Sequence, residues 1–242
     1  MGYNLLSGAR LLVRRKGNER RMLRGVSRKA WAVTTVLLVM AIVPMDWASA
    51  YTTTFSRHPF AGWHDSPAAT RWVARDGAMR RRYVPRSYGE LVRRTAFGLH
   101  DDFVVAAVIR TSPGRTNAGV TTLFKDHANH MWGKIEISPG HPRGFMSIGH
   151  MIRGRTESLL ARSPVRLKRG TPYRLRLAKH QMRLRLTVST RSGAQLRSIG
   201  HTLTTGERRA LAGGSKAGLR SKTLWDEDDG GSRWRWFGVF RV

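Results

Sequence analysis

The sequence predicts an all-β fold, a sandwich or barrel built from short antiparallel strands. From Asp102 onward, apolar and polar residues alternate with a period of two, which places successive side chains on opposite faces of a strand. Turn residues, such as Ser112-Pro113-Gly114 and Ser138-Pro139-Gly140, separate these alternating segments. The sequence shows no long helical pattern. Roughly nine short strands at such spacing are typical of sandwiches and barrels.

Residues 1–50 have the pattern of a secretory signal peptide. Basic residues precede an apolar run, Ala30–Met45, and the small residues Ala48-Ser49-Ala50 follow it as a cleavage site. The run is shorter than the ~20 residues of a membrane-spanning helix. We therefore expect a cleaved signal, with an uncleaved N-terminal anchor helix as the alternative. Met22 offers a second start, which makes residues 1–21 a candidate gene-model extension. The protein is expected to be secreted or envelope-associated, and to meet a membrane only through this segment.

Residues 51–96 have an irregular composition with scattered prolines and aromatics. The pattern predicts short strands around Arg71–Ala74 and a short helix near Tyr88–Arg94. This segment either packs on the sandwich as an extra layer or links it to the membrane.

The sandwich itself is expected over residues 97–242. In chain order, the expected strands are residues 102–110, 118–125, 131–138, 144–152, 173–179, 182–190, 194–203, 217–225 and 232–242. Residues 207–212 are expected to form one helical turn or a loop.

The clearest element is a hairpin over Tyr173–Thr190. Its apolar residues alternate toward one face and are candidate core residues: Leu175, Leu177, Met182, Leu184, Leu186 and Val188. The intervening arginines point to the other face: Arg174, Arg176, Arg183 and Arg185. Two interpretations of this arginine row stay open, a solvated outer face or a stripe that binds anions. Like charges directly opposite each other destabilise a sheet unless a partner neutralises them.

Three short sequence patterns occur in order along residues 167–242. The stretch Leu167-x-x-Gly170-x-x-Tyr173-Arg174-Leu175 precedes the hairpin, Ala217-Gly218-Leu219 lies in a late strand, and Phe237–Val242 closes the chain. Together they resemble concanavalin A-like jelly-roll domains, including laminin-G-like and glucanase-like ones, over residues 97–242. The resemblance implies an all-β jelly-roll sandwich of two antiparallel sheets, preceded here by the signal or anchor helix.

The resemblance also implies where a site would lie. In this family one sheet face carries the sugar site of lectins or the catalytic acids of glucanases. The strand Lys134-Ile135-Glu136-Ile137-Ser138 is the candidate catalytic strand, with Glu136 as its acid. Retaining hydrolysis needs two carboxyls ~5 Å apart, and this strand supplies only one. A secreted glycoside hydrolase or polysaccharide lyase stays as an alternative to a binding protein.

An acidic run, Asp226-Glu227-Asp228-Asp229, lies near the C-terminus. Carboxylates followed by glycines suit calcium, so the candidate metal ligands are Asp226, Asp228 and Asp229. The other interpretation is a hairpin loop whose acids pair with arginines close in sequence: Arg220, Arg233 and Arg235.

Tryptophans supply candidate residues for stacking on sugar rings or bases: Trp132, Trp225 and Trp234. The strip Arg233–Trp236 has two interpretations. Either both of its tryptophans enter the core and both arginines face solvent, or the aromatics face a ligand beside the cations. A bulge is expected near Gly238, where the alternation breaks.

Charge points to a polyanionic partner. The chain carries 44 basic and 15 acidic residues, a formal net charge of +29. Such a charge attracts acidic polysaccharide, wall polymers or nucleic acid. Cysteine is absent, which excludes thiolate metal sites. We therefore predict an exported protein that binds an anionic glycan or wall polymer on an Arg- and Trp-rich face, with calcium as the one candidate cofactor. An envelope protein that binds nucleic acid is a further alternative.

Overall fold

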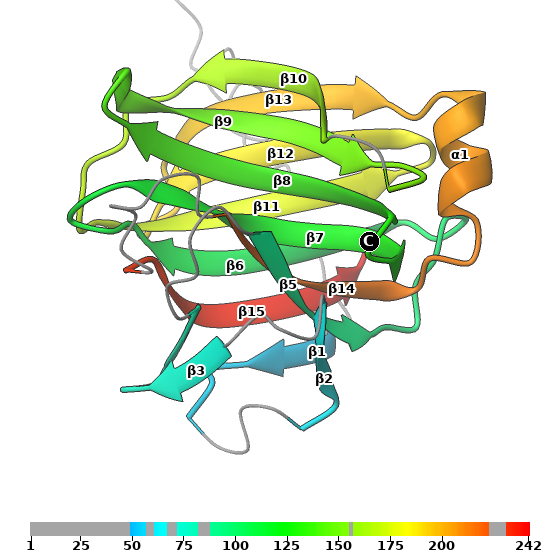
Figure 1. Cartoon of the computed structure of the whole chain (residues 1–242), viewed down its shortest axis with the longest axis horizontal. Coiled ribbons are helices and arrows are strands. Elements are labelled where there is room, and N and C mark those ends of the chain that lie inside the picture. The colour runs from blue at the N-terminus through cyan, green and yellow to red at the C-terminus, as the bar shows by residue number, and fades with distance from the viewer. Residues whose placement is uncertain (1–48, 57–60, 67–71, 82–87, 155–156, 223–230) are drawn as a thin grey trace, which may run out of the picture. The chain divides into compact units, whose positions relative to one another are not determined.

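The structure of the protein is a computed structural model, which describes residues 49–56, 61–66, 72–81, 88–154, 157–222 and 231–242. The apolar run of the expected signal segment, the acidic run and Trp225 lie outside these residues. The described residues form two antiparallel β-sheets that pack face to face, with one short helix (Figure 1). The expected sandwich of two antiparallel sheets is therefore confirmed.

Sheet I has eight strands among the described residues. In spatial order they are β13 (Gln195–Thr202), β12 (Arg183–Thr190), β11 (Pro172–His180), β6 (Phe103–Arg110), β15 (Arg233–Arg241), β4 (Ala78–Arg81) and β3 (Trp72–Arg75), and β1 (Ser49–Thr53) also pairs with β15.

Sheet II has seven strands, again counted over the described part of the chain. In spatial order they are β10 (Ser158–Pro164), β9 (His141–Met151), β8 (Asn129–Ser138), β7 (Thr116–Asp126), β14 (Lys216–Lys222), β5 (Tyr88–Arg94) and β2 (Trp63–Ser66). Strand β10 was not expected from the sequence.

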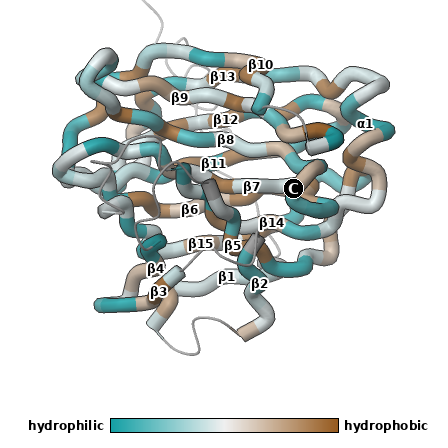
Figure 2. The backbone as a smooth tube through the Cα atoms, viewed as in Figure 1, coloured by the Kyte–Doolittle hydropathy of each residue, from teal (hydrophilic) through white to brown (hydrophobic). Residues whose placement is uncertain are grey.

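The hydrophobic core lies between the two sheets. Many strands alternate apolar and polar residues, so brown and teal segments follow one another along much of the tube in Figure 2. The β11–β12 hairpin shows this directly, because its expected core residues are fully buried: Leu175, Leu177, Leu184, Leu186 and Val188. Met182, in the turn, is partly buried and packs against the same cluster. The core prediction for this hairpin is confirmed.

The short helix expected near Tyr88–Arg94 is wrong, because these residues form strand β5. β5 pairs with β14 on one side and with β2 on the other, which satisfies its backbone groups along both edges. Its side chains alternate accordingly: Leu91 is in the core, and Glu90 lies on the other face opposite Arg220. Tertiary pairing outweighs the local helix preference of this stretch.

Other strands within residues 51–96 also join the sheets. β3 and β4 form a hairpin closed by Asp76-Gly77, whose φ angles of 54° and 64° are those of a type I′ turn. The Asp-Gly pair is the sequence signal that marks this hairpin. Together with β1, which pairs with β15, these strands extend sheet I beyond the part formed by residues 97–242.

The helix α1 (Thr205–Leu211) begins with a capping box, as the sequence Thr204-x-x-Glu207 favours. The Glu207 carboxylate accepts a hydrogen bond from the Thr204 backbone N–H at 2.7 Å. It also lies 2.9 Å from His150 Nδ1 on β9 and 3.0 Å from His201 Nε2 on β13. One carboxylate thus links β9 of sheet II to β13, an edge strand of sheet I. Within the described residues, no helix has the length and apolarity that crossing a membrane requires.

Candidate functional site

The arginine row of the hairpin lies on the outer face of sheet I, as the alternation predicts. Arg174, Arg183 and Arg185 are exposed, and Arg176 is half-buried. The register places these four arginines opposite Ser189, Thr187, His180 and Ala178, so no two of them face each other directly across the hairpin. The expected repulsion between directly opposed like charges is therefore avoided by the register alone.

A β-bulge in β15 sends its two tryptophans to opposite faces. The register against β6 pairs Trp234 with Ile109 and Trp236 with Val108, so Arg235 is the extra residue. Trp234 is fully buried in the core, and its Nε1 donates a hydrogen bond to the Gly119 carbonyl at 3.0 Å. Trp234 therefore cannot stack on a ligand, which corrects the sequence prediction. Neither interpretation of the strip placed one tryptophan on each face.

Trp236 instead lies on the outer face of sheet I. Its ring stacks on that of Phe240, with centroids 5.7 Å apart and an interplanar angle of 23°. Gly238, between them, makes room for both rings, because an added Cβ would lie 2.6 Å from Phe240 and 2.8 Å from Trp236. The sequence pattern did not indicate which face of the sheet the Trp236 side chain occupies. The bulge that decides this lies at Arg235, three residues before the expected position near Gly238.

The first hollow on this face joins the arginines to the aromatic pair. It has a volume of ≈ 440 Å³. Its lining residues come from five strands that are adjacent in the sheet, in the order β13, β12, β11, β6 and β15. They are Gln195, Thr187, Ser189, Arg174, Arg176, Ala106, Trp236 and Phe240, with Gly193 from the β12–β13 turn. Four inter-strand spacings make this roughly 19 Å across. Arg183 and Arg185 are not among the lining residues.

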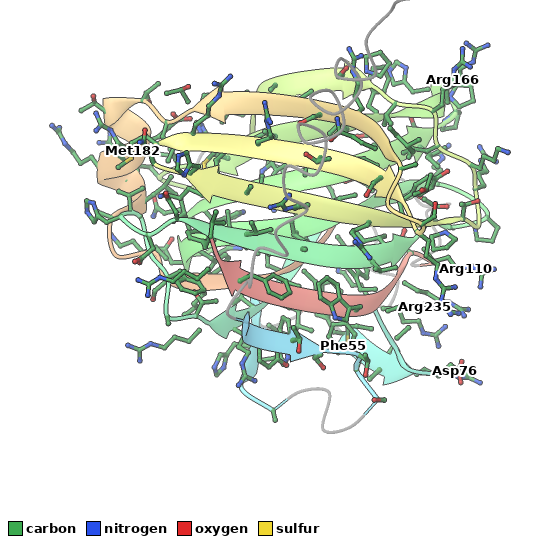
Figure 3. All side chains as sticks on the ribbon, turned by 180° about the vertical axis from the view of Figure 1, so that it is seen from behind. Phe55, Asp76, Arg110, Arg166, Met182 and Arg235 are labelled. Carbon is green, nitrogen blue, oxygen red and sulfur yellow. The ribbon has the colours of Figure 1, made fainter. Side chains whose placement is uncertain are left out.

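A second hollow, of ≈ 330 Å³, lies on the other side of Trp236. It is lined by Val108, Arg110, Gly170, Pro172, Arg191, Arg235 and Trp236. Arg110 and Arg235 lie at the same end of the neighbouring strands β6 and β15 in Figure 3. None of the described residues that line either hollow is acidic. Partial burial lowers the pKa of Arg176, as desolvation of a guanidinium does.

The outer face of sheet II carries a different arrangement, a cluster of buried opposite charges. Arg220 forms ion pairs with Glu90 and Glu157, and its Nη1 lies 3.1 Å from His130 Nε2. Burial by itself would raise the pKa of Glu90, but Arg220 and then His130 lower it below its usual value. Lys222 Nζ lies 2.7 Å from Glu157. Arg220 therefore forms its ion pairs with two acids that are distant in sequence, Glu90 and Glu157.

Trp132 belongs to this cluster and not to a ligand-stacking surface. It is 2% exposed and lies directly over Gly149, where an added Cβ would be 2.1 Å from the indole ring. The Arg220 guanidinium and the Lys134 ammonium each lie 5.1 Å from its ring centroid. In this structure Trp132 has no ring face open to a sugar, which corrects the second of the three predicted stacking residues.

Glu136, the candidate catalytic acid, stands beside Lys134, whose Nζ lies 3.4 Å from its carboxylate. Burial lowers the pKa of Lys134 to about 8, although Glu136 opposes that shift. Glu136 lines a hollow of ≈ 420 Å³ with Arg115, His141 and Arg162. No second carboxyl is found among the described residues that line it, so the structure does not add the partner that glycoside hydrolysis requires.

The predicted calcium ligands, Asp226, Asp228 and Asp229, lie outside the described residues. Among the residues that the structure does describe, no group of three or more His, Cys, Asp or Glu side chains could hold a metal ion.

Neither a protein-family model nor a curated protein matches this sequence. Solved structures do resemble the fold. A module named CBM2 of the evolved Dit of Lactobacillus casei BL23 phage J-1 matches with a TM-score of 0.61 and 9% identity, over 81% of this chain and 96% of that one. A GH43 protein from Bacillus licheniformis has a TM-score of 0.61 and 13% identity, over 81% of this chain and 40% of that one.

The exoplasmic/lumenal domain of VIP36, in a form bound to Ca²⁺ and Man3GlcNAc, matches with a TM-score of 0.53 and 12% identity, over 75% of this chain and 84% of that one. At these identities the likeness establishes the fold alone. The fold is a β-sandwich shared with a CBM2 module, a GH43 protein and the lumenal domain of VIP36, which is consistent with the resemblance to concanavalin A-like jelly rolls.

Proposed function

We propose that the protein is an exported carbohydrate-binding protein, and that the outer face of sheet I binds an anionic glycan or wall polymer. The observation that carries the proposal is the first hollow. It combines Arg174 and Arg176 with the stacked pair of Trp236 and Phe240, and no described lining residue is acidic. The similarity in fold to carbohydrate-binding modules and to a glycan-bound lectin supports the choice of a glycan as partner.

The hollow suits this ligand for two chemical reasons. A guanidinium presents a planar fork that can hold a carboxylate, sulfate or phosphate through two parallel hydrogen bonds. An indole ring offers an apolar face on which a sugar ring can stack. The formal net charge of +29 adds long-range attraction that raises the rate of encounter with any polyanion. Attraction and recognition therefore have separate sources, and experiments can distinguish them.

The chain offers a matched pair of double variants for this purpose. Arg174→Gln/Arg176→Gln removes two charges from the hollow on β11, and Arg183→Gln/Arg185→Gln removes two from the neighbouring strand β12, outside the hollow. We expect the first to weaken binding of polygalacturonate by about tenfold or more, because charge-assisted hydrogen bonds are lost. The second should cause only the small loss that follows from net charge. Equal losses in both would overturn the proposal.

Binding is measured by calorimetry with polygalacturonate, a neutral glycan and single-stranded DNA at low and high salt. Affinity for polygalacturonate that persists at high salt supports a shaped site, since purely electrostatic attraction weakens steeply with salt. Equal binding of every polyanion that vanishes at high salt contradicts it.

Nucleic acid is the second candidate, because aromatic pairs beside arginines also bind single-stranded nucleic acids by stacking on bases. Tighter binding of DNA than of any acidic glycan, lost in Trp236→Ala, would favour it.

A further inference from the structure

The first and second hollows are neighbours on the outer face of sheet I. The first and second share Trp236, which therefore separates two groups of arginines: Arg174 and Arg176 on one side, Arg110 and Arg235 on the other. A chain that stacks one ring on Trp236 thus has a guanidinium group available in both directions from that ring.

A third hollow, of ≈ 750 Å³, continues from the second and shares Pro172 and Arg191 with it. Its lining includes Arg166 and Lys168, which are exposed, together with the apolar side chains of Tyr173 and Leu196. Arg166 lies on the same edge of the molecule as Arg110 and Arg235 in Figure 3. None of the described residues that line this hollow is acidic.

The walls between the hollows are held by hydrogen bonds. Arg110 Nε donates to the Gly170 carbonyl at 2.9 Å, which orients the guanidinium between strand and loop. Thr111 Oγ1 donates to the Lys168 carbonyl at 2.8 Å, and the Lys168 backbone N–H donates to the Tyr173 hydroxyl at 2.6 Å. Groups oriented before binding lose less entropy when a ligand arrives.

Resting on the proposed function, we infer that these hollows form one continuous site for a linear polyanionic glycan of several units. One sugar ring stacks on Trp236, and acid groups are bound on both sides of it, with the third hollow holding a more distant unit. The first hollow alone crosses five strands, roughly 19 Å, which is longer than a single pyranose ring. The ligand class is therefore a polymer that carries acid groups repeatedly along its length, and a single acidic sugar fills only part of the site.

The test uses the full chain and a size series of oligogalacturonates, from monosaccharide to octasaccharide, with methyl-esterified oligomers as uncharged controls. We expect affinity to rise over the first several units and then level off once the three hollows are filled. Trp236→Ala should weaken the binding of every charged oligomer by about tenfold, because the stacking of a sugar ring on the indole is lost.

Arg166→Gln separates this inference from the proposed function. Its side chain lines only the third hollow of the three described, so the variant should bind short oligomers like the wild type and long ones several-fold more weakly. Arg185→Gln removes the same charge outside the three hollows and should leave the length dependence unchanged.

Two outcomes would overturn the inference while the proposed function stands: a monosaccharide that binds as tightly as the octasaccharide, or an Arg166→Gln variant that weakens all lengths equally. Failure of every oligomer to bind would instead overturn the proposed function.

Discussion

Replacing Arg220 by Gln tests the physical account of the buried charge cluster. Arg220 is 1% exposed and Glu90 is 0% exposed, so the substitution leaves a carboxylate without its main ion-pair partner in the interior. Removing one partner of a buried pair costs about 3–5 kcal/mol of folding stability. For a domain of this size that corresponds to a fall in Tm of roughly 6–20 °C. Urea and thermal unfolding, followed by tryptophan fluorescence, measure both quantities.

The same variant makes a prediction about pH. In the wild type the lowered pKa of Glu90 contributes stability that is present above its unfolded pKa and is lost as pH falls through the folded value. In Arg220→Gln the burial that raises the pKa prevails, so protonation stabilises the variant and its deficit should shrink toward pH ~4.

Two comparisons complete this test. Arg185→Gln, at an exposed position, should change stability by no more than about 0.5 kcal/mol. Replacing both members of the pair, in Glu90→Gln/Arg220→Met, should recover part of the loss, since no charge is then buried alone. A loss below about 1 kcal/mol in Arg220→Gln, or a deficit that grows on acidification, would refute the reasoning.

Two further substitutions probe packing and the helix cap. Gly149→Ala should destabilise the fold by about 1–3 kcal/mol, because its Cβ would lie 2.1 Å from the Trp132 ring. Gly140→Ala, with no atom within 4 Å of the added Cβ, is the control, and equal urea midpoints for the two variants would contradict this account. Glu207→Gln should lower the free energy of unfolding by about 1–3 kcal/mol at neutral pH. Although burial raises the pKa of Glu207, hydrogen bonds from Thr204 and the histidines lower it overall, so the wild-type advantage should disappear as pH falls through the folded pKa. Urea titrations at several acidic pH values measure the difference in unfolding free energy between the wild type and Glu207→Gln. A wild-type advantage that persists below the folded pKa would contradict a stabilising role of the ionised carboxylate.

Local pattern was sufficient for the β11–β12 hairpin. For α1 the sequence prediction was one helical turn or a loop over residues 207–212, and the helix begins at Thr205. In the hairpin, arginine and leucine alternate over Arg174–Leu177 and Arg183–Leu186, and a shift by one residue would bury the arginines. At the helix, Thr204 and Glu207 satisfy each other's backbone groups within four residues of chain. In both cases the interacting groups are neighbours in the sequence, so the sequence contains the interaction.

The positions of the tryptophans could not be predicted in this way. Trp234 and Trp236 belong to one alternating strip, and a one-residue bulge against β6 decides which of them enters the core. Trp132 is buried because Gly149, on the next strand, leaves room for its ring. The direction of each side chain depends on a partner strand that the local pattern does not identify.

By itself, the sequence determined that this protein is an antiparallel β-sandwich with a strongly basic surface and an arginine row on one side of a hairpin. Alternation and turn residues are local properties, and net charge is a sum over residues that needs no coordinates. Only the tertiary structure decided that Arg174 and Arg176 meet Trp236 in a hollow, and that Arg220 neutralises Glu90 at a separation of 130 residues. Both depend on register between distant strands, where a shift of one residue exchanges the two faces of a sheet.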